Sequence, residues 1–150
     1  MLRLGKERDV NVILGLILEF FGHTKYGHLP VDYIATSGLI RDFVNELNED
    51  LVCILWEVNG KVTGILAGQI QTIPLLNRKV AVECLWWVEP EARGSEAGEQ
   101  LLDAFEHWAK LRGADMVQMM SLPDRTGKAL SRFYRRRGYD LTEVTYTKEL

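Results

Sequence analysis

Hydrophobic positions in the first fifty residues recur at the three- and four-residue spacing of amphipathic helices. One stripe follows Asp9, whose carboxylate suits a helix N-cap, and runs to Phe21; a second follows Ser37. The stripes consist of Val10, Ile13, Leu14, Ile17, Leu18 and Phe21, and of Leu39, Ile40, Phe43, Val44 and Leu47. The pattern predicts two helices that cover a sheet, joined by an irregular loop over residues 22–33.

The next part of the chain has the pattern of strands. Segments Leu51–Val58 and Lys61–Ile73 flank Asn59-Gly60, the pair preferred in two-residue type I′ turns, which predicts a β-hairpin. After a short turn, Lys79–Val88 is almost continuously apolar, as in strands buried on both faces. These segments predict an antiparallel meander.

A helix and a further strand follow the meander. Apolar residues within 97–109 recur at the spacing of one helical face. Gly113 suits the C′ position, where such a helix ends. Ala114–Leu122 is another apolar strand. Because a helix separates this strand from Lys79–Val88, the two can run parallel as a βαβ unit, and a splayed parallel pair leaves a cleft.

The C-terminal region predicts one more helix and one more strand. Thr126 can cap the helix, Gly138 stops it, and Leu141–Lys148 is rich in strand-forming residues. The whole pattern predicts an α/β fold with a mixed central β-sheet, an antiparallel meander plus a splayed parallel pair, flanked by about four helices.

Composition predicts one soluble domain spanning residues 1–150. The chain is 47% hydrophobic and 26% charged, and a net charge of −3 argues against nucleic-acid binding. Cys53 and Cys84 lie in apolar runs and are interpreted as buried thiols in a reducing compartment. The apolar run Val10–Phe21 is too short for a membrane span and lacks signal-peptide features, so we expect a cytoplasmic protein without a membrane partner.

The junction after the third strand can hold a phosphate. It reads V-E-P-E-A-R-G-S-E-A-G-E-Q-L-L from Val88 to Leu102; Gly94 and Gly98 permit close backbone approach, and the following helix begins with unpaired N–H groups. Taken alone, an ordinary strand-to-helix connection explains it as well. A second segment, F-Y-R-R-R-G-Y, occupies residues 133–139.

Together the two segments resemble the GNAT superfamily of N-acetyltransferases. That family has V-x-P-x-x-R-G-x-G-x-G/A-x-x-L-L and, at a similar separation, F-Y-x-x-x-G-F. The matching positions are Val88, Pro90, Arg93, Gly94, Gly98, Leu101, Leu102, Phe133, Tyr134, Gly138 and Tyr139. The resemblance covers the chain from about Leu51 onward and implies a GNAT-like fold with acetyl-CoA (coenzyme A) as cofactor.

The resemblance also implies where the coenzyme binds. Its diphosphate would bind backbone N–H groups between Arg93 and Glu99, with Arg93 adding charge, and its pantetheine arm would pair with the strand ending at Val88. The implied cofactor-binding residues are Trp86, Trp87, Val88, Arg93, Gly94, Ser95, Glu96, Ala97, Gly98 and Glu99.

Two residues are candidates for proton transfer. Tyr134 matches the family's usual general acid; alternatively, it is a core aromatic on the stripe of its helix. Glu83 is a charge within an apolar strand and the candidate general base; simple alternation places it on the face of Leu85 and Trp87.

Other positions are less specific. Glu96 stands where the family usually has Gly, and Gly127 where Asn is common. His23 and His28 lie in the loop that the resemblance assigns to the acceptor pocket, and no ligand spacing predicts a metal. The basic residues Arg125, Lys128, Arg132, Arg135, Arg136 and Arg137 form a solvated face, contact the coenzyme's 3′-phosphate, or bind RNA, in decreasing order of preference.

The leading hypothesis is an acetyl-CoA-dependent N-acetyltransferase that moves an acetyl group to a primary amine of a small molecule or peptide by direct, sequential transfer. The alternative is a noncatalytic acyl-CoA binder or a degenerate GNAT interaction module. A nucleotide-binding domain is a third hypothesis, but the chain lacks the P-loop lysine and the G-x-G-x-x-G spacing. The sequence does not decide between a monomer and a homodimer.

Overall fold

The computed structural model describes residues 1–123 and 125–150. For Arg125 and Thr126 it describes the backbone only. The chain divides into two compact units, Met1–Met119 and Met120–Leu150. Each unit is described by itself.

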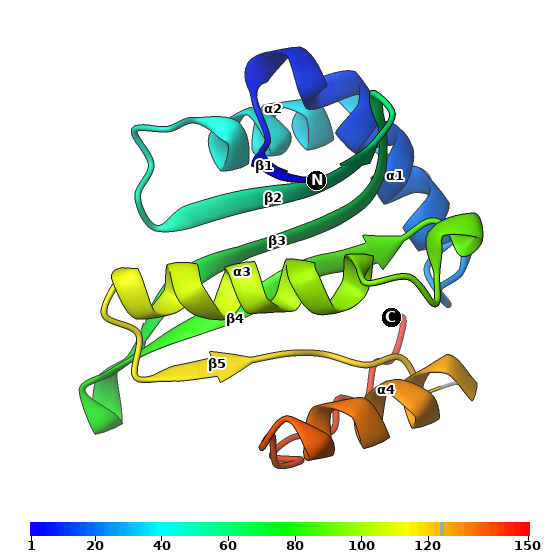
Figure 1. Cartoon of the computed structure of the whole chain (residues 1–150). Helices are drawn as coiled ribbons and strands as arrows, with labels where there is room; N and C mark the ends of the chain where they lie inside the picture. The colour runs from blue at the N-terminus through cyan, green and yellow to red at the C-terminus, as the bar shows by residue number, and fades with distance from the viewer. Residues whose placement is uncertain (124) are drawn as a thin grey trace. The chain divides into compact units, whose positions relative to one another are not determined.

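The N-terminal unit is built on a mixed five-stranded sheet in the order β1-β2-β3-β4-β5. The strands are β1 (Leu2–Leu4), β2 (Leu51–Val58), β3 (Lys61–Ile73), β4 (Arg78–Val88) and β5 (Met116–Gln118). The first four pair antiparallel, and β5 pairs parallel to β4. The α/β mixed sheet is therefore confirmed, and Figure 1 shows β4 and β5 adjacent at their start and diverging afterwards.

The predicted hairpin is confirmed to the residue. Asn59 and Gly60 have φ angles of 51° and 80°, which is the backbone of a type I′ turn. This turn matches the right-handed twist of β2 and β3 and sets their register.

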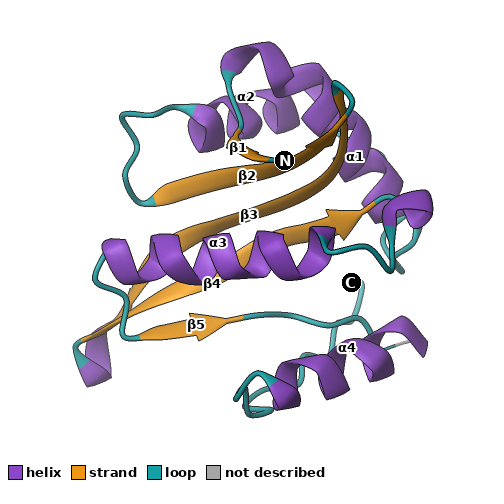
Figure 2. Ribbon diagram, viewed as in Figure 1, coloured by secondary structure: helices purple, strands orange, loops and turns teal. Residues whose placement is uncertain are grey.

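Helices cover both faces of the sheet. Helices α1 (Val10–Gly22) and α2 (Tyr33–Val44) pack on one face, and α3 (Ala97–Leu111) packs on the other, as Figure 2 shows. Because both faces are covered, the sheet carries two apolar cores. Strand β4 is almost continuously hydrophobic because its side chains on both faces enter a core. Short 3₁₀ helices lie at Glu7–Asp9, Pro74–Leu76 and Pro90–Ala92.

Helix α1 begins directly after Asp9, as predicted, whereas the start of α2 and the role of Asp9 differ from expectation. Helix α2 begins at Tyr33 rather than after Ser37, because the Asp32 carboxylate accepts hydrogen bonds from the backbone N–H groups of Ile34 and Ala35 (3.1 and 2.9 Å). Asp9 precedes α1, but its side chain does not cap that helix.

Asp9 belongs instead to a partly buried ion network that the sequence did not reveal. Arg3 donates from Nη1 and Nη2 to the Asp9 carboxylate (2.7 and 2.9 Å) and from Nε to Glu57 (2.5 Å). Asp9 also accepts from the Lys6 backbone N–H (2.9 Å). The guanidinium bonds hold the pKa of the Asp9 carboxyl below its usual value. The network ties β1 to β2 and to the start of α1.

The two cysteines differ in burial. Cys53 is buried, and burial raises the pKa of its thiol to about 12. Cys84, which we expected to be buried too, is exposed. Its thiol pKa is nevertheless raised to about 11, by partial desolvation and by the neighbouring Glu83.

The C-terminal unit contains α4 (Arg125–Arg136) followed by Gly138 at positive φ, as predicted for a helix stop. The helix begins one residue before Thr126, whose side chain, proposed as the cap, lies outside the described residues. The strand expected over Leu141–Lys148 is wrong, because residues 139–150 have no regular secondary structure. High strand propensity does not form a strand without a paired neighbour.

Candidate functional site

A β-bulge interrupts β4 in its middle. The β3–β4 register pairs Ala67 with Leu85 and then Gly68 with Glu83, so Cys84 is an extra residue without a ladder partner. A one-residue insertion reverses the phase of side-chain alternation beyond it. Accordingly, the side chain of Leu85 lies in the core against α1 and α2. Before the bulge, the side chains alternate in the opposite phase, so they lie on the other faces from those that simple alternation counted from Leu85 predicts.

This reversal corrects the predicted orientation of Glu83. Residues directly opposite in an antiparallel pair share a face. Glu83 pairs with Gly68, and a Cβ built on Gly68 would lie 2.5 Å from the Phe105 ring of α3. Glu83 therefore belongs to the α3 face, opposite to Trp87. Its side chain is buried, with 5% of its surface exposed.

Pairing between β4 and β5 ends where the bulge begins. The parallel ladder joins Val80–Val82 to Met116–Gln118 and stops there, so β5 is much shorter than the expected Ala114–Leu122. Among residues 1–123 and 125–150, no strand pairs with the outer edge of β4 from Glu83 onward. The end of β4 is thus open to a hydrogen-bonding partner along that edge.

The backbone direction at the end of β4 follows from the ladder. Glu89 donates its N–H to the Thr63 carbonyl on β3 (2.9 Å), so the N–H and C=O of Val88 face the outer edge. The Val88 carbonyl accepts a hydrogen bond from Nε of Arg93 (3.0 Å). The outer edge ends beside the loop that leads to α3.

That loop turns sharply and delivers the first turn of α3. The 3₁₀ turn Pro90–Ala92 is followed by Gly94 at φ 79°, a conformation that L side chains rarely adopt. Ser95 Oγ donates to the Ala92 carbonyl (2.7 Å) and accepts from the Ala97 N–H (3.2 Å). The hydroxyl therefore caps α3, and the predicted loop Arg93–Glu99 is one continuous turn into the helix.

Gly98 is a glycine that the fold itself does not require. Its φ is not positive, and a Cβ there would meet only Trp86 Cζ2, at 3.6 Å, an ordinary van der Waals separation. A bare Cα in the first turn of a helix leaves room for a ligand against the N–H groups. Glu96 and Glu99 flank this turn and are exposed, so neither carboxylate is buried against it.

Trp87 joins the loop to α1. The Arg93 guanidinium carbon lies 4.5 Å from the Trp87 ring centroid, and the rings of His23 and Phe20 lie 5.1 and 5.9 Å away. Trp87 is 7% exposed, and its indole N–H is buried without a hydrogen-bond partner in the described part of the chain. Of the two loop histidines, His23 thus touches a predicted site residue.

Tyr134 lies in the C-terminal unit. It is buried, and its hydroxyl donates to the Met120 carbonyl (2.9 Å). Its ring lies 5.4 Å from that of Tyr139 and 6.1 Å from that of Phe133. Both suggested roles are compatible with these contacts, because the hydroxyl acts as an O–H donor and the ring packs against two other aromatic rings.

Gly127 occupies the position where Asn is common in the family. A side chain at this position would collide with the backbone carbonyl of Leu122, so the local structure accepts only glycine. The substitution thus reflects how the chain enters α4.

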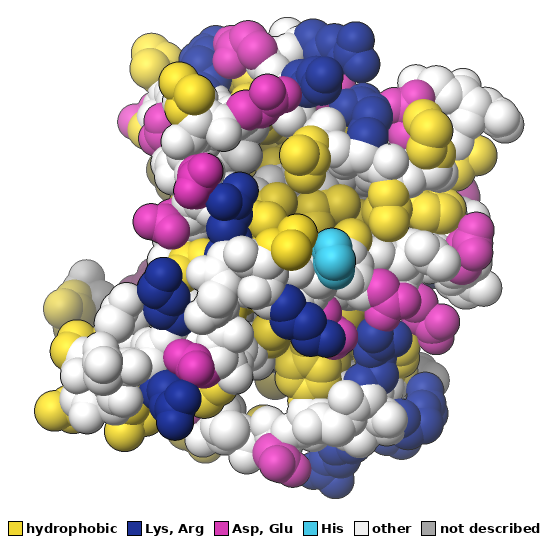
Figure 3. Space-filling view, turned by 60° about the vertical axis from the view of Figure 1, so that its left-hand side comes forward, with side chains coloured by type: hydrophobic (Ala, Val, Ile, Leu, Met, Phe, Trp, Pro, Cys, Tyr) yellow, Lys and Arg dark blue, Asp and Glu magenta, His cyan; other side chains and the backbone are white. Residues whose placement is uncertain are grey.

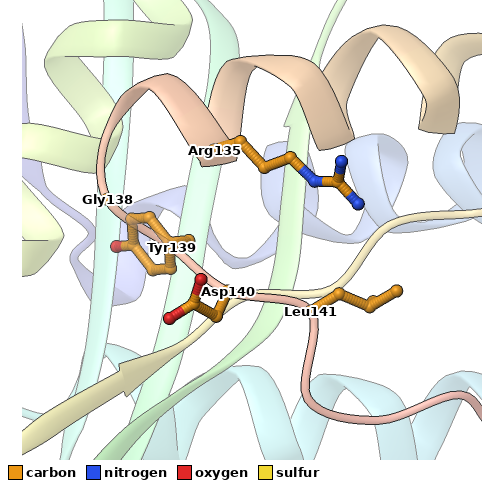
Figure 4. A pocket seen from close by; sticks show the side chains of 5 residues that line it. All are labelled: Arg135, Gly138, Tyr139, Asp140 and Leu141. Carbon is orange, nitrogen blue, oxygen red and sulfur yellow. The ribbon is translucent and has the colours of Figure 1, made fainter.

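A pocket in the C-terminal unit has a volume of about 660 Å³. It is lined by Arg135, Gly138, Tyr139, Asp140 and Leu141, as Figure 4 shows. Its lining contains one basic side chain, Arg135, and one acidic side chain, Asp140. None of the predicted site residues is among the lining residues. Elsewhere on α4, the basic residues Lys128, Arg132 and Arg136 are exposed.

Acidic and basic side chains are interspersed on the face shown in Figure 3, in keeping with the small net charge. In the described ranges, no three His, Cys, Asp or Glu side chains gather as metal ligands would. No helix there is long and apolar enough to cross a bilayer.

The fold defines an α/β protein in which the end of β4 is unpaired on its outer edge. A loop connects this strand to the N-terminus of α3, which is suited to an anion. The sequence matches the acetyltransferase (GNAT) family over residues 16–139. The chain belongs to this family, which confirms the resemblance stated above. No curated protein matches the chain significantly.

Solved structures share the fold at low sequence identity. A transcriptional regulator from Bacillus halodurans superposes with a TM-score of 0.77 at 16% identity, over 100% of this chain and 99% of that one. An acetyltransferase from Trypanosoma brucei gives 0.70 at 21%, over 100% and 99%. An aminoglycoside acetyltransferase from an uncultured soil metagenomic sample gives 0.73 at 16%, over 100% and 95%.

Proposed function

We propose that the protein is an acetyl-CoA-dependent N-acetyltransferase that acts on a primary amine by direct transfer. The observation that carries the proposal is the turn from β4 into α3 in a chain of the acetyltransferase family. Gly98 supports the fit to the coenzyme, because it keeps the first helical turn bare without being needed for packing. Residues Arg93–Glu99 would hold the diphosphate, and the outer edge of Trp86–Val88 would pair with the pantetheine arm.

When bound, the coenzyme supplies an activated acetyl thioester. The chain's part is to orient that group, stabilise negative charge and move two protons. A backbone N–H on the outer edge of β4 would polarise the acetyl carbonyl, and removal of such a donor typically costs a hundred- to a thousandfold in rate.

Tyr134 is proposed to donate its proton to the departing sulfur. A phenol is an O–H donor, and a departing thiolate accepts its hydrogen bond as negative charge develops on the sulfur. In the structure its hydroxyl already acts as a donor, toward the Met120 carbonyl.

Glu83 is proposed as the group that accepts the proton of the amine. Drawing a free amine of pKa about 10.4 from solution at pH 7 costs about 4.6 kcal/mol, which a carboxylate acting directly or through water would offset. Cys84 is a poor alternative nucleophile, because a thiol with a pKa of about 11 is protonated at neutral pH. This supports direct transfer rather than an acyl-enzyme.

The proposal is tested first by binding and then by turnover. Coenzyme A at a hundred times its Kd should stabilise the protein by about 2.7 kcal/mol, or about 5 to 10 °C in Tm. A shift with ATP or NAD, but none with coenzyme A, would favour the nucleotide-binding alternative.

Turnover separates an enzyme from a binder. Thiol release from acetyl-CoA is measured against polyamines, aminoglycosides, amino acids and peptides with free N-termini. Aminoglycosides are included because a structural neighbour acetylates them. Binding of coenzyme A without thiol release for any amine would support the noncatalytic alternative.

A further inference from the structure

The face of Trp87 already binds a cation. The Arg93 guanidinium lies 4.5 Å from the ring centroid, within the range of a cation–π contact. Trp87 is 7% exposed, whereas Arg93 is exposed. The indole face therefore lies just beneath the surface, and Arg93 is the side chain that covers it.

Arg93 has two possible partners of unequal strength. In the structure its Nε–H donates to the Val88 carbonyl, a neutral acceptor, at 3.0 Å. A diphosphate at the start of α3 would offer charged oxygens, which bind guanidinium about twice as strongly and in a bidentate manner. Arg93 stands one residue before Gly94, so the loop that would hold the diphosphate also carries this guanidinium.

We infer that the Trp87 face is a subsite for an ammonium group of the acceptor and that Arg93 covers it until the coenzyme binds. This inference rests on the proposed function. Release of Arg93 would free the Val88 carbonyl for the pantetheine arm and the indole face for a second cation. Phe20 of α1 packs edge-on against the indole at 69°, and His23, which follows α1, packs against it at a tilt of 32°, so both help to hold the ring in place.

The subsite narrows the class of acceptor. A cation on an aromatic face is stabilised as a cation, whereas the nitrogen that attacks a thioester must be neutral. The ammonium on Trp87 is therefore not the reacting group. The acceptor class is molecules with at least two basic nitrogens, such as diamines.

The experiment follows the indole N–H signals of the protein by NMR. The chain has four tryptophans, which are assigned with single Trp→Phe variants. The probes are 1,4-diaminobutane and, as a neutral control, 1-butanol, each titrated with and without saturating coenzyme A. We expect a saturable shift of the Trp87 signal with the diamine that is about 2- to 30-fold tighter with coenzyme A present, and none with 1-butanol.

The variant Arg93→Gln tests the subsite without the coenzyme. Without the guanidinium, the diamine should bind Trp87 in the absence of coenzyme A as tightly as it binds the wild-type protein in the presence of coenzyme A. The matched control is Arg78→Gln, an exposed arginine at the other end of β4 that pairs with Asp115 (3.0 Å); it should behave as wild type.

The outcomes separate this inference from the proposed function. If Arg93→Gln shows no tighter diamine response at Trp87, or if 1-butanol produces the same shift, the subsite is refuted. If coenzyme A fails to bind wild-type protein, the proposed function fails, and the Arg93→Gln titration still decides the cation subsite.

Discussion

Replacing Gly98 with alanine should separate coenzyme binding from folding. The added methyl group would lie 3.6 Å from Trp86 Cζ2, so it creates no clash. Alanine is favoured over glycine within a helix by about 0.5–1 kcal/mol. The coenzyme-free variant is therefore expected to unfold at the same temperature as wild type or a few degrees higher.

The same methyl group would project from the turn that is proposed to hold the diphosphate. A hydrogen bond to a charged group contributes about 1.5–3 kcal/mol, so loss of one such bond raises Kd for coenzyme A by about 10- to 150-fold. The effect on binding thus has the opposite sign to the effect on stability.

Calorimetry gives Kd, and thermal unfolding gives Tm for the same samples. The matched control is Gly15→Ala in α1, where a Cβ meets nothing within 4 Å; it should gain stability and bind the coenzyme normally. Gly98→Ala protein that binds coenzyme A as wild type does would show that the start of α3 is not the diphosphate site.

Four further substitutions have defined outcomes. Tyr134→Phe should lower turnover at least tenfold with near-normal coenzyme Kd, and an unchanged rate would remove it from the mechanism. Glu83→Gln should flatten the low-pH limb of the rate profile; an unaltered limb would exclude it as the base. Gly68→Ala should cost about 1–3 kcal/mol in urea unfolding, because the methyl group would overlap the Phe105 ring, and wild-type stability would contradict that packing. Asp9 has a lowered pKa, so its stabilisation is present above about pH 4 and is lost as pH falls through the folded-state pKa; Asp9→Asn should lose about 2–3 kcal/mol of unfolding free energy at pH 7, and the difference from wild type should shrink as pH is lowered below about 4.

Local chemistry explains which elements could be predicted. The Asn59-Gly60 turn fixes both strands of its hairpin, because its backbone conformation and the flanking pattern agree. The end of α3 at Gly113 follows from the same kind of local preference. The family motif adds the loop before α3, whose glycine at position 94 adopts the conformation that only glycine favours.

Features that depend on distant partners could not be predicted. The sequence pattern suggests that Arg3 and Asp9 lie on the surface, and only the fold shows that Arg3 pairs with both Asp9 and Glu57 in a partly buried network. The segment Leu141–Lys148 has the composition of a strand, yet it has no regular secondary structure. Propensity and charge pattern carry no information about such partners.

The bulge at Cys84 is the least predictable feature and the one that most affects the site. A strand buried on both faces has no polar alternation, so a one-residue insertion leaves no trace in its hydrophobic pattern. Its consequence is that Glu83 and Trp87 lie on opposite faces of β4. An ammonium held over Trp87 is therefore on the other side of the strand from the Glu83 carboxylate. If both groups serve one acceptor, its second, reacting nitrogen passes its proton to Glu83 through water around the open outer edge of β4, and the variant Glu83→Asp tests this relay. A relay through water should tolerate the shorter carboxylate with only a modest loss of rate, whereas direct contact should not.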